Sequence, residues 1–265
     1  MKPRAMWLRL RNTPVLRMLQ IEEGLFRADT RSWFITNAWD TPPAGDERAA
    51  AAAHDAAQSI VLGISGKPAE MLHRAAVREL GVPVIRRFSG GGTIISDADT
   101  LFATFICAAD AEPDVGAYPE PILAWTAGVY EAALRQCGAP NFAVRANDYC
   151  LNTPEGDLKF GGNAQGISGK RWLHHTSLLW SFDRRRMDLL QQPKKQPEYR
   201  ARRPHASFVR GLGETLRCRE EFGGALVDAA RGKWELVPVG VEEAEAALAL
   251  PHRQVTRLLA DEEIG

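Results

Sequence analysis

Residues 82–95 read Val-Pro-Val-Ile-Arg-Arg-Phe-Ser-Gly-Gly-Gly-Thr-Ile-Ile, two apolar runs joined through three consecutive glycines. The β-branched residues on either side predict two short strands. A sharp turn between strands needs one or two glycines, and a third costs backbone entropy without adding packing. The extra glycine therefore indicates that a ligand lies close to the main chain of Gly90, Gly91 and Gly92.

Two arginines precede this turn. The guanidinium groups of Arg86 and Arg87 suit a carboxylate or a phosphate. Backbone N–H groups in such a turn also bind anionic oxygens. The segment therefore predicts a site for an anionic ligand, and a plain glycine-rich hairpin with a surface arginine pair is the alternative.

The segments around the turn predict a mixed architecture. Apolar patterns predict strands at residues 7–11, 32–36, 59–64, 101–107, 149–152 and 175–182. They predict helices at residues 14–27, 69–80 and 119–138, with a helical or variable alanine-rich segment at residues 49–57. Strands and helices do not alternate strictly, so we expect an α+β fold rather than a doubly wound sheet.

Composition excludes several classes of partner. Lysine plus arginine number 33, as do aspartate plus glutamate, so the chain has no overall field for nucleic acid or an anionic membrane. No apolar run reaches the roughly 18 residues of a membrane span. The four cysteines form no CxxC pair, which argues against zinc and favours a reducing compartment. We expect a cytoplasmic protein; the basic first 20 residues leave mitochondrial or plastid targeting as the alternative.

Two further segments each have a functional interpretation and an ordinary structural one. Asn147-Asp148 is a common turn dipeptide, but its carboxylate also suits magnesium beside a nucleotide phosphate. Residues 157–165 place Lys159 before two glycines and two amides. A fixed lysine polarises a carbonyl and stabilises charge on a bridging oxygen, whereas most lysines are solvated.

Residues 172–180 form an apolar segment with two adjacent histidines, His174 and His175. Neighbouring residues of a strand point to opposite faces, so the pair is poorly placed to bind one metal ion. We expect at least one of them to be a hydrogen-bonded structural histidine. The hydroxyl groups of Thr176 and Ser177 are available to a ligand.

Taken in this order, the four segments resemble the lipoate-protein ligase A family of the wider biotin/lipoate ligase and octanoyltransferase group. The resemblance covers most of residues 7–210, including Arg203-Pro204-His205-Ala206-Ser207-Phe208 near its end. It implies a class II biotin/lipoate ligase-like catalytic domain, a mixed β-sheet flanked by helices with a bifurcated pocket. We expect one such domain over residues 1–265, without a separate C-terminal accessory domain.

The resemblance also implies a two-step reaction. Lipoate and ATP, with Mg²⁺, first form lipoyl-adenylate, and the acyl group then passes to a lysine of an acceptor domain on a carrier protein. Lys159 matches the family lysine that contacts the acyl carbonyl and the phosphate. The matched substrate-binding positions are Arg87, Ser89, Gly90, Gly91, Gly92, Thr93, Gly162, Asn163 and Ala164. Asn147 and Asp148 match the nucleotide and magnesium side, and the further candidates are His175, Thr176, Ser177 and Cys150.

The chain departs from the family pattern at several positions. Ser96 and Thr176 stand where a histidine and a glycine are usual, and Gly161 stands where a serine is common. These changes bear on acyl-chain choice and on adenylation, and a separate accessory chain is a possible partner.

Three alternatives stay open. One is an octanoyl or lipoyl transferase that takes the acyl group from a carrier, with Cys150 as the nearest candidate nucleophile. A biotin ligase fits the lysine and His-His segments less well. A non-catalytic protein that binds lipoate or a lipoyl domain is the third, although buried charges without a catalytic use are costly.

Overall fold

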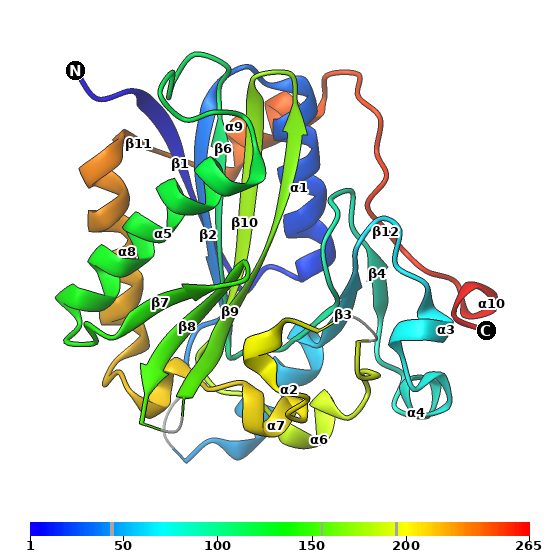
Figure 1. Cartoon of the computed structure of the whole chain (residues 1–265). Helices are drawn as coiled ribbons and strands as arrows, with labels where there is room; N and C mark the ends of the chain where they lie inside the picture. Colours follow the sequence, from blue (N-terminus) through cyan, green and yellow to red (C-terminus); the bar gives the residue numbers. More distant parts are fainter. Residues whose placement is uncertain (43–44, 155, 194–195) are drawn as a thin grey trace.

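The computed structural model describes residues 1–42, 45–154, 156–193 and 196–265, without the side chains of residues 205 and 206 (Figure 1). The described residues form two sheets, with strand orders β11-β1-β2-β6-β10-β9-β8-β7 and β12-β4-β3-β5. Parallel and antiparallel pairs occur in both sheets, and helices flank them. The predicted α+β mixed-sheet fold is therefore confirmed.

The larger sheet is built from β1 (Arg4–Arg11), β2 (Ser32–Ala38), β6 (Thr100–Cys107), β7 (Phe142–Arg145), β8 (Asp148–Thr153), β9 (Gly156–Ser168), β10 (Arg171–Leu179) and β11 (Glu235–Val239). The smaller sheet is built from β3 (Ser59–Leu62), β4 (Val84–Arg86), β5 (Ile94–Ser96) and β12 (Arg257–Leu258). The first predicted strand, at residues 7–11, lies within β1 in the larger sheet.

The α-helices are α1 (Val15–Ala28), α2 (Glu47–Ala57), α3 (Pro68–Met71), α4 (Arg74–Glu79), α5 (Pro119–Gln136), α6 (Arg184–Met187), α7 (His205–Phe208), α8 (Arg219–Lys233), α9 (Val241–Leu248) and α10 (Asp261–Ile264). Two 3₁₀ turns cover Glu198–Arg200 and Leu212–Glu214. Helices α5 and α8 pack together on one face of the larger sheet, and α1 with α9 covers the other (Figure 1).

Alternation along the central strands supplies both hydrophobic cores. Trp33 and Ile106 pack toward α1, whereas their chain neighbours Phe34 and Phe105 pack toward α5 and α8. The rings of Phe34 and Phe105 stack with centroids 4.8 Å apart. Because successive strand residues face opposite sides, one short apolar run contributes to both layers.

The glycine turn does not close a hairpin. Strands β4 and β5 both pair with β3, which lies between them, so the turn passes over the end of β3. A Cβ on Gly63, just after β3, would lie 2.5 Å from the carbonyl oxygen of Gly91. Gly63 is thus required by this close approach, and the hairpin alternative for residues 82–95 is wrong.

The predicted helix at residues 69–80 is interrupted. It is divided into α3 and α4 because Leu72 is extended, with φ −125° and ψ 143°. Leu72 forms a bridge with Leu190, and the N–H of His73 donates to the carbonyl oxygen of Leu189 at 2.9 Å. Burial of Leu72 against Leu190 outweighs the local helical pattern.

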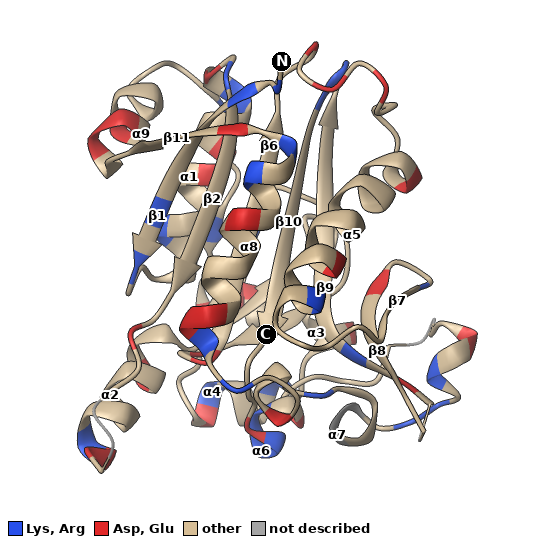
Figure 2. Ribbon diagram, turned by 90° about the vertical axis from the view of Figure 1, so that its left-hand side faces the viewer, with Lys and Arg blue, Asp and Glu red and all other residues tan. Residues whose placement is uncertain are grey.

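Charges of both signs are mixed over the helices on the side that Figure 2 shows, consistent with a formal net charge of zero. No described helix is long and apolar enough to cross a bilayer.

Candidate active site

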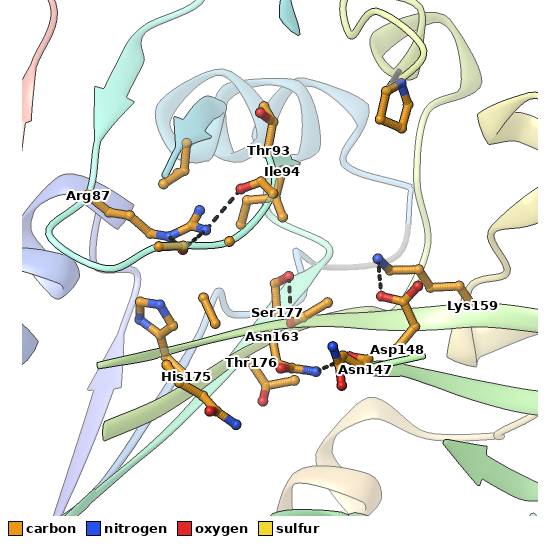
Figure 3. Close-up of a pocket in the computed structure, with 18 of the residues that line it drawn as sticks. Arg87, Thr93, Ile94, Asn147, Asp148, Lys159, Asn163, His175, Thr176 and Ser177 are labelled. Atoms are coloured by element: carbon orange, nitrogen blue, oxygen red, sulfur yellow. Dashed lines mark hydrogen bonds and ion pairs between the residues drawn. The ribbon is translucent and has the colours of Figure 1, made fainter. Parts of the chain in front are cut away.

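One cavity of about 710 Å³ brings together most of the residues singled out in the sequence. Its size lies within the range of small-molecule sites. One side is formed by Arg87 and residues 90–93, and we call the whole segment 87–93 the glycine wall (Figure 3). The other side carries Asn147, Asp148 and Lys159, which we call the lysine wall.

The edge of a strand separates the two walls. Strand β9 pairs with β8 only through residues 156–161, whereas its later residues pair with β10 alone in the described register. Along this edge, Gly162 and Ala164 share a face with Ser177 and His175, and Asn163 shares the other face with Thr176. All six line the cavity, so it contacts both faces of the edge strand, which fits the expected bifurcated pocket.

A buried guanidinium organises the glycine wall. Arg87 is 4% exposed; its Nε donates to the carbonyl oxygen of Gly90 at 3.1 Å, and its Nη2 donates to that of Gly92 at 2.9 Å. Burial lowers the pKa of Arg87 to about 10, opposed by the charge of Glu22. Gly91 has φ +92°, and a Cβ there would lie 2.8 Å from Arg87 Nη2. The turn therefore needs glycine at this position.

The lysine wall depends on a β-bulge. Gly161 pairs with Tyr149 and Lys159 pairs with Cys150, which leaves Phe160 as the extra residue. Phe160 is buried in the core beneath α5, whereas Lys159 lines the cavity. Bulges re-aim side chains in this way and are frequent beside active sites. The Lys159 ammonium lies near Gly162, where an added Cβ would be 3.7 Å from its Nζ.

The two charges of the lysine wall are paired. Lys159 Nζ lies 2.6 Å from Asp148 Oδ1, and their side chains are 27% and 19% exposed. The hydroxyl of Tyr199 donates to the other oxygen, Asp148 Oδ2, at 2.7 Å. Burial and the charge of Asp148 raise the pKa of Tyr199, so this hydroxyl remains a donor. Asn163 fixes the preceding turn by donating to the Asn147 carbonyl oxygen at 2.6 Å.

Apolar side chains line another part of the cavity. They come from α1, β3, β5 and β6: Val15, Met18, Leu19, Val61, Ile94 and Phe102. The sequence does not predict these residues as site residues, because their spacing is that of ordinary core positions. Such a lining suits an acyl chain, and the cations on the two walls suit its carboxylate and a phosphate.

The adjacent histidines have separate environments, as expected. His174 is fully buried and lies 2.9 Å from the Tyr149 hydroxyl on the α5 side. Burial lowers its pKa to about 3, so it is a neutral structural residue. His175 lines the cavity on the opposite face. No group of three or more potential metal-ligating side chains occurs within the described ranges.

Two predicted site residues lie behind the cavity surface. Ser89 is 3% exposed beside Arg87, and Cys150 is fully buried with its Sγ 3.5 Å from the Tyr199 hydroxyl. Burial raises the pKa of the Cys150 thiol to about 11. Neither residue lines the cavity. Ser89 and Cys150 therefore lack direct access to a ligand in this structure.

The segment after β10 contributes residues that the sequence analysis did not single out as site residues. Arg200 lines the cavity and stacks over Phe208, with the guanidinium carbon 4.7 Å from the ring centroid. The Arg210 N–H donates to the Lys159 carbonyl oxygen at 2.8 Å, which attaches this segment to β9. An arginine next to a tyrosine gives no signal in the sequence that distinguishes it from a surface position.

Comparison with known proteins identifies the family. The family described as "Lipoyl protein ligase A/B catalytic domain" matches residues 44–228, and the chain belongs to it. An inactive lipoate–protein ligase 2 of Plasmodium falciparum is 27% identical over 180 residues, covering 58% of this chain and 47% of that protein. The chain therefore spans about half the length of this curated relative.

Solved structures share the fold. A structure from a study of a bi-partite lipoate protein ligase and its E2 lipoyl domain from Thermoplasma acidophilum has a TM-score of 0.69 at 16% identity. The match covers 93% of this chain and 91% of that chain. A lipoate-protein ligase A bound with ATP has a TM-score of 0.67 at 14% identity, covering 94% and 93%.

Proposed function

We propose that this chain is a lipoate-protein ligase that activates lipoate with ATP and transfers the lipoyl group to a lysine of an acceptor domain. One observation carries the proposal: a single cavity joins an apolar lining to two cations, Arg87 and Lys159. An acyl-adenylate has the same parts, an apolar chain, a carbonyl and a phosphate. Family membership and the ATP-bound structure of similar fold support this assignment.

In the first step, a lipoate carboxylate oxygen attacks the α-phosphorus of ATP and pyrophosphate leaves. Arg87, which the fold holds in place, and Lys159, once it has turned from Asp148 to the ligand, stabilise the negative charge that develops on the phosphate and bridging oxygens. In the second step, the acceptor amine attacks the acyl carbonyl, AMP leaves and one proton is released. The cavity contributes by holding the anhydride oriented toward the amine.

The donor set is compatible with Mg²⁺. Magnesium is commonly held by one or two carboxylates together with substrate phosphates and water. Asp148 is the carboxylate on the lysine wall, and the preceding residue, Asn147, also lines the cavity. We propose that Asp148 holds the ion, which would neutralise phosphate charge when bound.

Lys159 then exchanges partners during the reaction. Its ammonium pairs with Asp148, and the pair is partly exposed, so it is held by only a modest free energy. We propose that Lys159 turns to the acyl-phosphate oxygen when substrate enters, while Tyr199 continues to hold Asp148.

The experiment incubates the purified chain, together with the second chain proposed below, with lipoate, ATP and magnesium, and measures pyrophosphate release and the intact mass of a lipoyl acceptor domain. We expect both pyrophosphate and an ATP-dependent gain of one lipoyl group. Absence of pyrophosphate, with transfer from an octanoylated carrier instead, would favour the transferase. The burial of Cys150 argues against a cysteine-dependent form of that reaction.

A separate accessory chain is part of the proposal. The similar protein from T. acidophilum is described as bi-partite, and we propose that this chain forms one catalytic domain, residues 1–265, that works with a second chain. Affinity purification of the tagged chain from its own cells, followed by mass spectrometry, tests this. Full ligation by the chain alone would remove the need for a partner.

A non-catalytic lipoate-binding role is the second candidate. It is favoured by the name of the P. falciparum relative, which is described as inactive. Calorimetry with lipoate, run beside the pyrophosphate assay, separates the two candidates. Lipoate binding without pyrophosphate release, with and without accessory chains, would support the binding role.

A further inference from the structure

A buried carboxylate lies beneath the glycine wall. Glu22 is in the middle of α1 and is fully buried among apolar side chains. Its Oε1 accepts from the Thr104 hydroxyl at 2.7 Å, and its Oε2 lies 2.8 Å from His175 Nδ1. A buried carboxylate is costly unless it is paired and hydrogen-bonded. The contacts of Glu22 therefore need an explanation beyond helix packing.

The hydrogen bonds continue from Glu22 to the cavity. His175 Nε2 lies 2.8 Å from Ser89 Oγ, and Arg87 Nε donates to the same oxygen at 3.0 Å. The chain of contacts thus runs from α1 through β10 to the glycine wall. Figure 3 shows His175 and Arg87 on the same side of the cavity.

The donors and acceptors of these side chains determine the direction of the hydrogen bonds between them. The Glu22 carboxylate only accepts, so His175 Nδ1 carries a proton. Ser89 Oγ accepts from Arg87, and its own hydrogen has His175 Nε2 as its one acceptor in the described part of the chain. The hydrogen bonds therefore run from the Arg87 cation through Ser89 and His175 to the Glu22 anion, and each intermediate group donates to the next.

The arrangement has the residue types of a serine hydrolase triad but a different role. In such a triad the serine oxygen faces the substrate and is activated by histidine. Here Ser89 is 3% exposed, does not line the cavity and accepts from a guanidinium. The groups that reach the cavity are His175 and Arg87.

We infer that Glu22 and His175 are positioning residues that act through Ser89 to fix the guanidinium of Arg87 at the acyl-phosphate junction. The inference rests on the proposed function for the identity of the ligand. Arg87 uses Nε and Nη2 on Ser89 and the glycine carbonyls, and its Nη1 has no protein partner in the described ranges. That group remains for an anionic oxygen of the ligand.

The charges support the same role. A buried guanidinium without a counter-charge is strongly disfavoured, and removal of one member of a buried charge pair leaves the other uncompensated. Glu22 supplies the counter-charge through two intermediate side chains, so Arg87 needs no carboxylate in the cavity itself. The face toward the ligand stays cationic.

Glu23 provides a matched control. It is the next residue of α1, is equally buried, and accepts from Arg27 Nε at 2.8 Å and the Thr256 N–H at 2.8 Å. These contacts attach the C-terminal segment to α1 and do not involve the cavity. Glu22→Gln and Glu23→Gln therefore make the same change at adjacent buried positions.

The experiment measures two properties of the full chain: the Kd for lipoate by calorimetry, and solvent exchange of the Arg87 Nε–H by NMR. We expect Glu22→Gln to weaken lipoate binding about tenfold and to accelerate that exchange, as for contacting residues in one network. We expect Glu23→Gln to lower thermal stability while leaving both properties within about twofold. Equal responses of the two variants would overturn the inference.

A double-mutant cycle separates positioning from general loss of structure. In a Ser89→Ala background the series of hydrogen bonds from Arg87 to Glu22 is already interrupted. Glu22→Gln should therefore change the Kd for lipoate by less than about a further twofold. Additive effects would show that Glu22 does not act through Ser89. If Glu22→Gln does not fold, His175→Gln replaces it in the same cycle. The NMR measurement needs no ligand, so it tests the positioning role even if the chain fails to adenylate lipoate.

Discussion

The glycine wall and the lysine wall hold their cations in different ways. Arg87 is buried and bonded to main-chain carbonyls, and its counter-charge lies deep in the protein. Lys159 is partly exposed and pairs directly with Asp148 at the cavity surface. The first cation is preset by the fold, whereas the second can exchange partners with little rearrangement. A site that binds an anion and then stabilises new charge benefits from one cation of each kind.

The largest effect should come from the exchangeable cation. Lys159→Ala removes the ammonium from the lysine wall, and we expect ligation to fall about 10²–10³-fold, as for loss of one oxyanion donor. The melting temperature should change little because a partly exposed ion pair contributes about 1 kcal/mol or less. Single-turnover transfer to an acceptor domain and thermal unfolding measure the two quantities.

Lys170→Ala is the control for that prediction. Lys170 lies in the exposed turn between β9 and β10, outside the cavity lining. The two variants lose the same type of side chain, one from β9 and one from the turn that follows it. Ligation by Lys159→Ala at the rate of Lys170→Ala would remove Lys159 from the mechanism.

The glycine wall should respond through its backbone. Gly91→Ala places a side chain at φ +92° and 2.8 Å from Arg87 Nη2, whereas an added Cβ at Gly92 meets nothing within 4 Å. We expect Gly91→Ala to cost about 1–2 kcal/mol of unfolding free energy and to weaken lipoate binding about tenfold. Gly92→Ala should change either quantity much less. Denaturant unfolding measures the free energy of unfolding, and calorimetry measures lipoate binding. Equal losses in the two variants would show that the glycine wall does not depend on the backbone conformation of Gly91.

A smaller effect is expected where the lysine wall is braced. Tyr199→Phe removes the hydroxyl that donates to Asp148 at 2.7 Å but keeps the ring, whose centroid lies 5.3 Å from that of Phe208. We expect kcat/KM for ATP to fall about threefold to tenfold, since one hydrogen bond to a charged group is lost. Tyr118→Phe, at a 71% exposed position, is the control. An unchanged kcat/KM in both variants would mean that the hydrogen bond from Tyr199 is not needed to hold Asp148 in place.

The sequence predicts best the parts of the site that local chemistry marks. Three consecutive glycines are costly, and a lysine before two glycines is unusual in an apolar strand, so both walls stand out. The strands and helices could be predicted because apolar residues recur at a different spacing in each kind of element. The break in the helix at residues 69–80 was missed because Leu72 is extended by a contact with Leu190, which no local pattern encodes.

The sequence predicts least where function depends on distant pairs. Glu22 lies 153 residues from its partner His175, and its position in an apolar helix gives no indication of a cavity. Val15, Met18 and Leu19 have the spacing of a core helix, and only the fold shows that this face also lines the site. Single-sequence reasoning detects residue types at fixed spacing, but it does not detect the pairs that the tertiary structure brings together.

The smallest effect is expected at Cys150, the residue that distinguishes a ligase from a cysteine-dependent transferase. Its thiol is buried behind the lysine wall, and burial raises its pKa to about 11, so the thiolate that such a transferase needs is scarce near neutral pH. We expect Cys150→Ser to change ligation by less than about twofold, with a loss of about 1 kcal/mol in stability from the buried hydroxyl. The assay follows ATP-dependent ligation and octanoyl transfer from a carrier in parallel, with the partly buried Cys218→Ser as control. Loss of octanoyl transfer in Cys150→Ser alone would show that the lysine wall moves far enough to expose the thiol, and the two walls would then have to be reinterpreted as parts of a transferase.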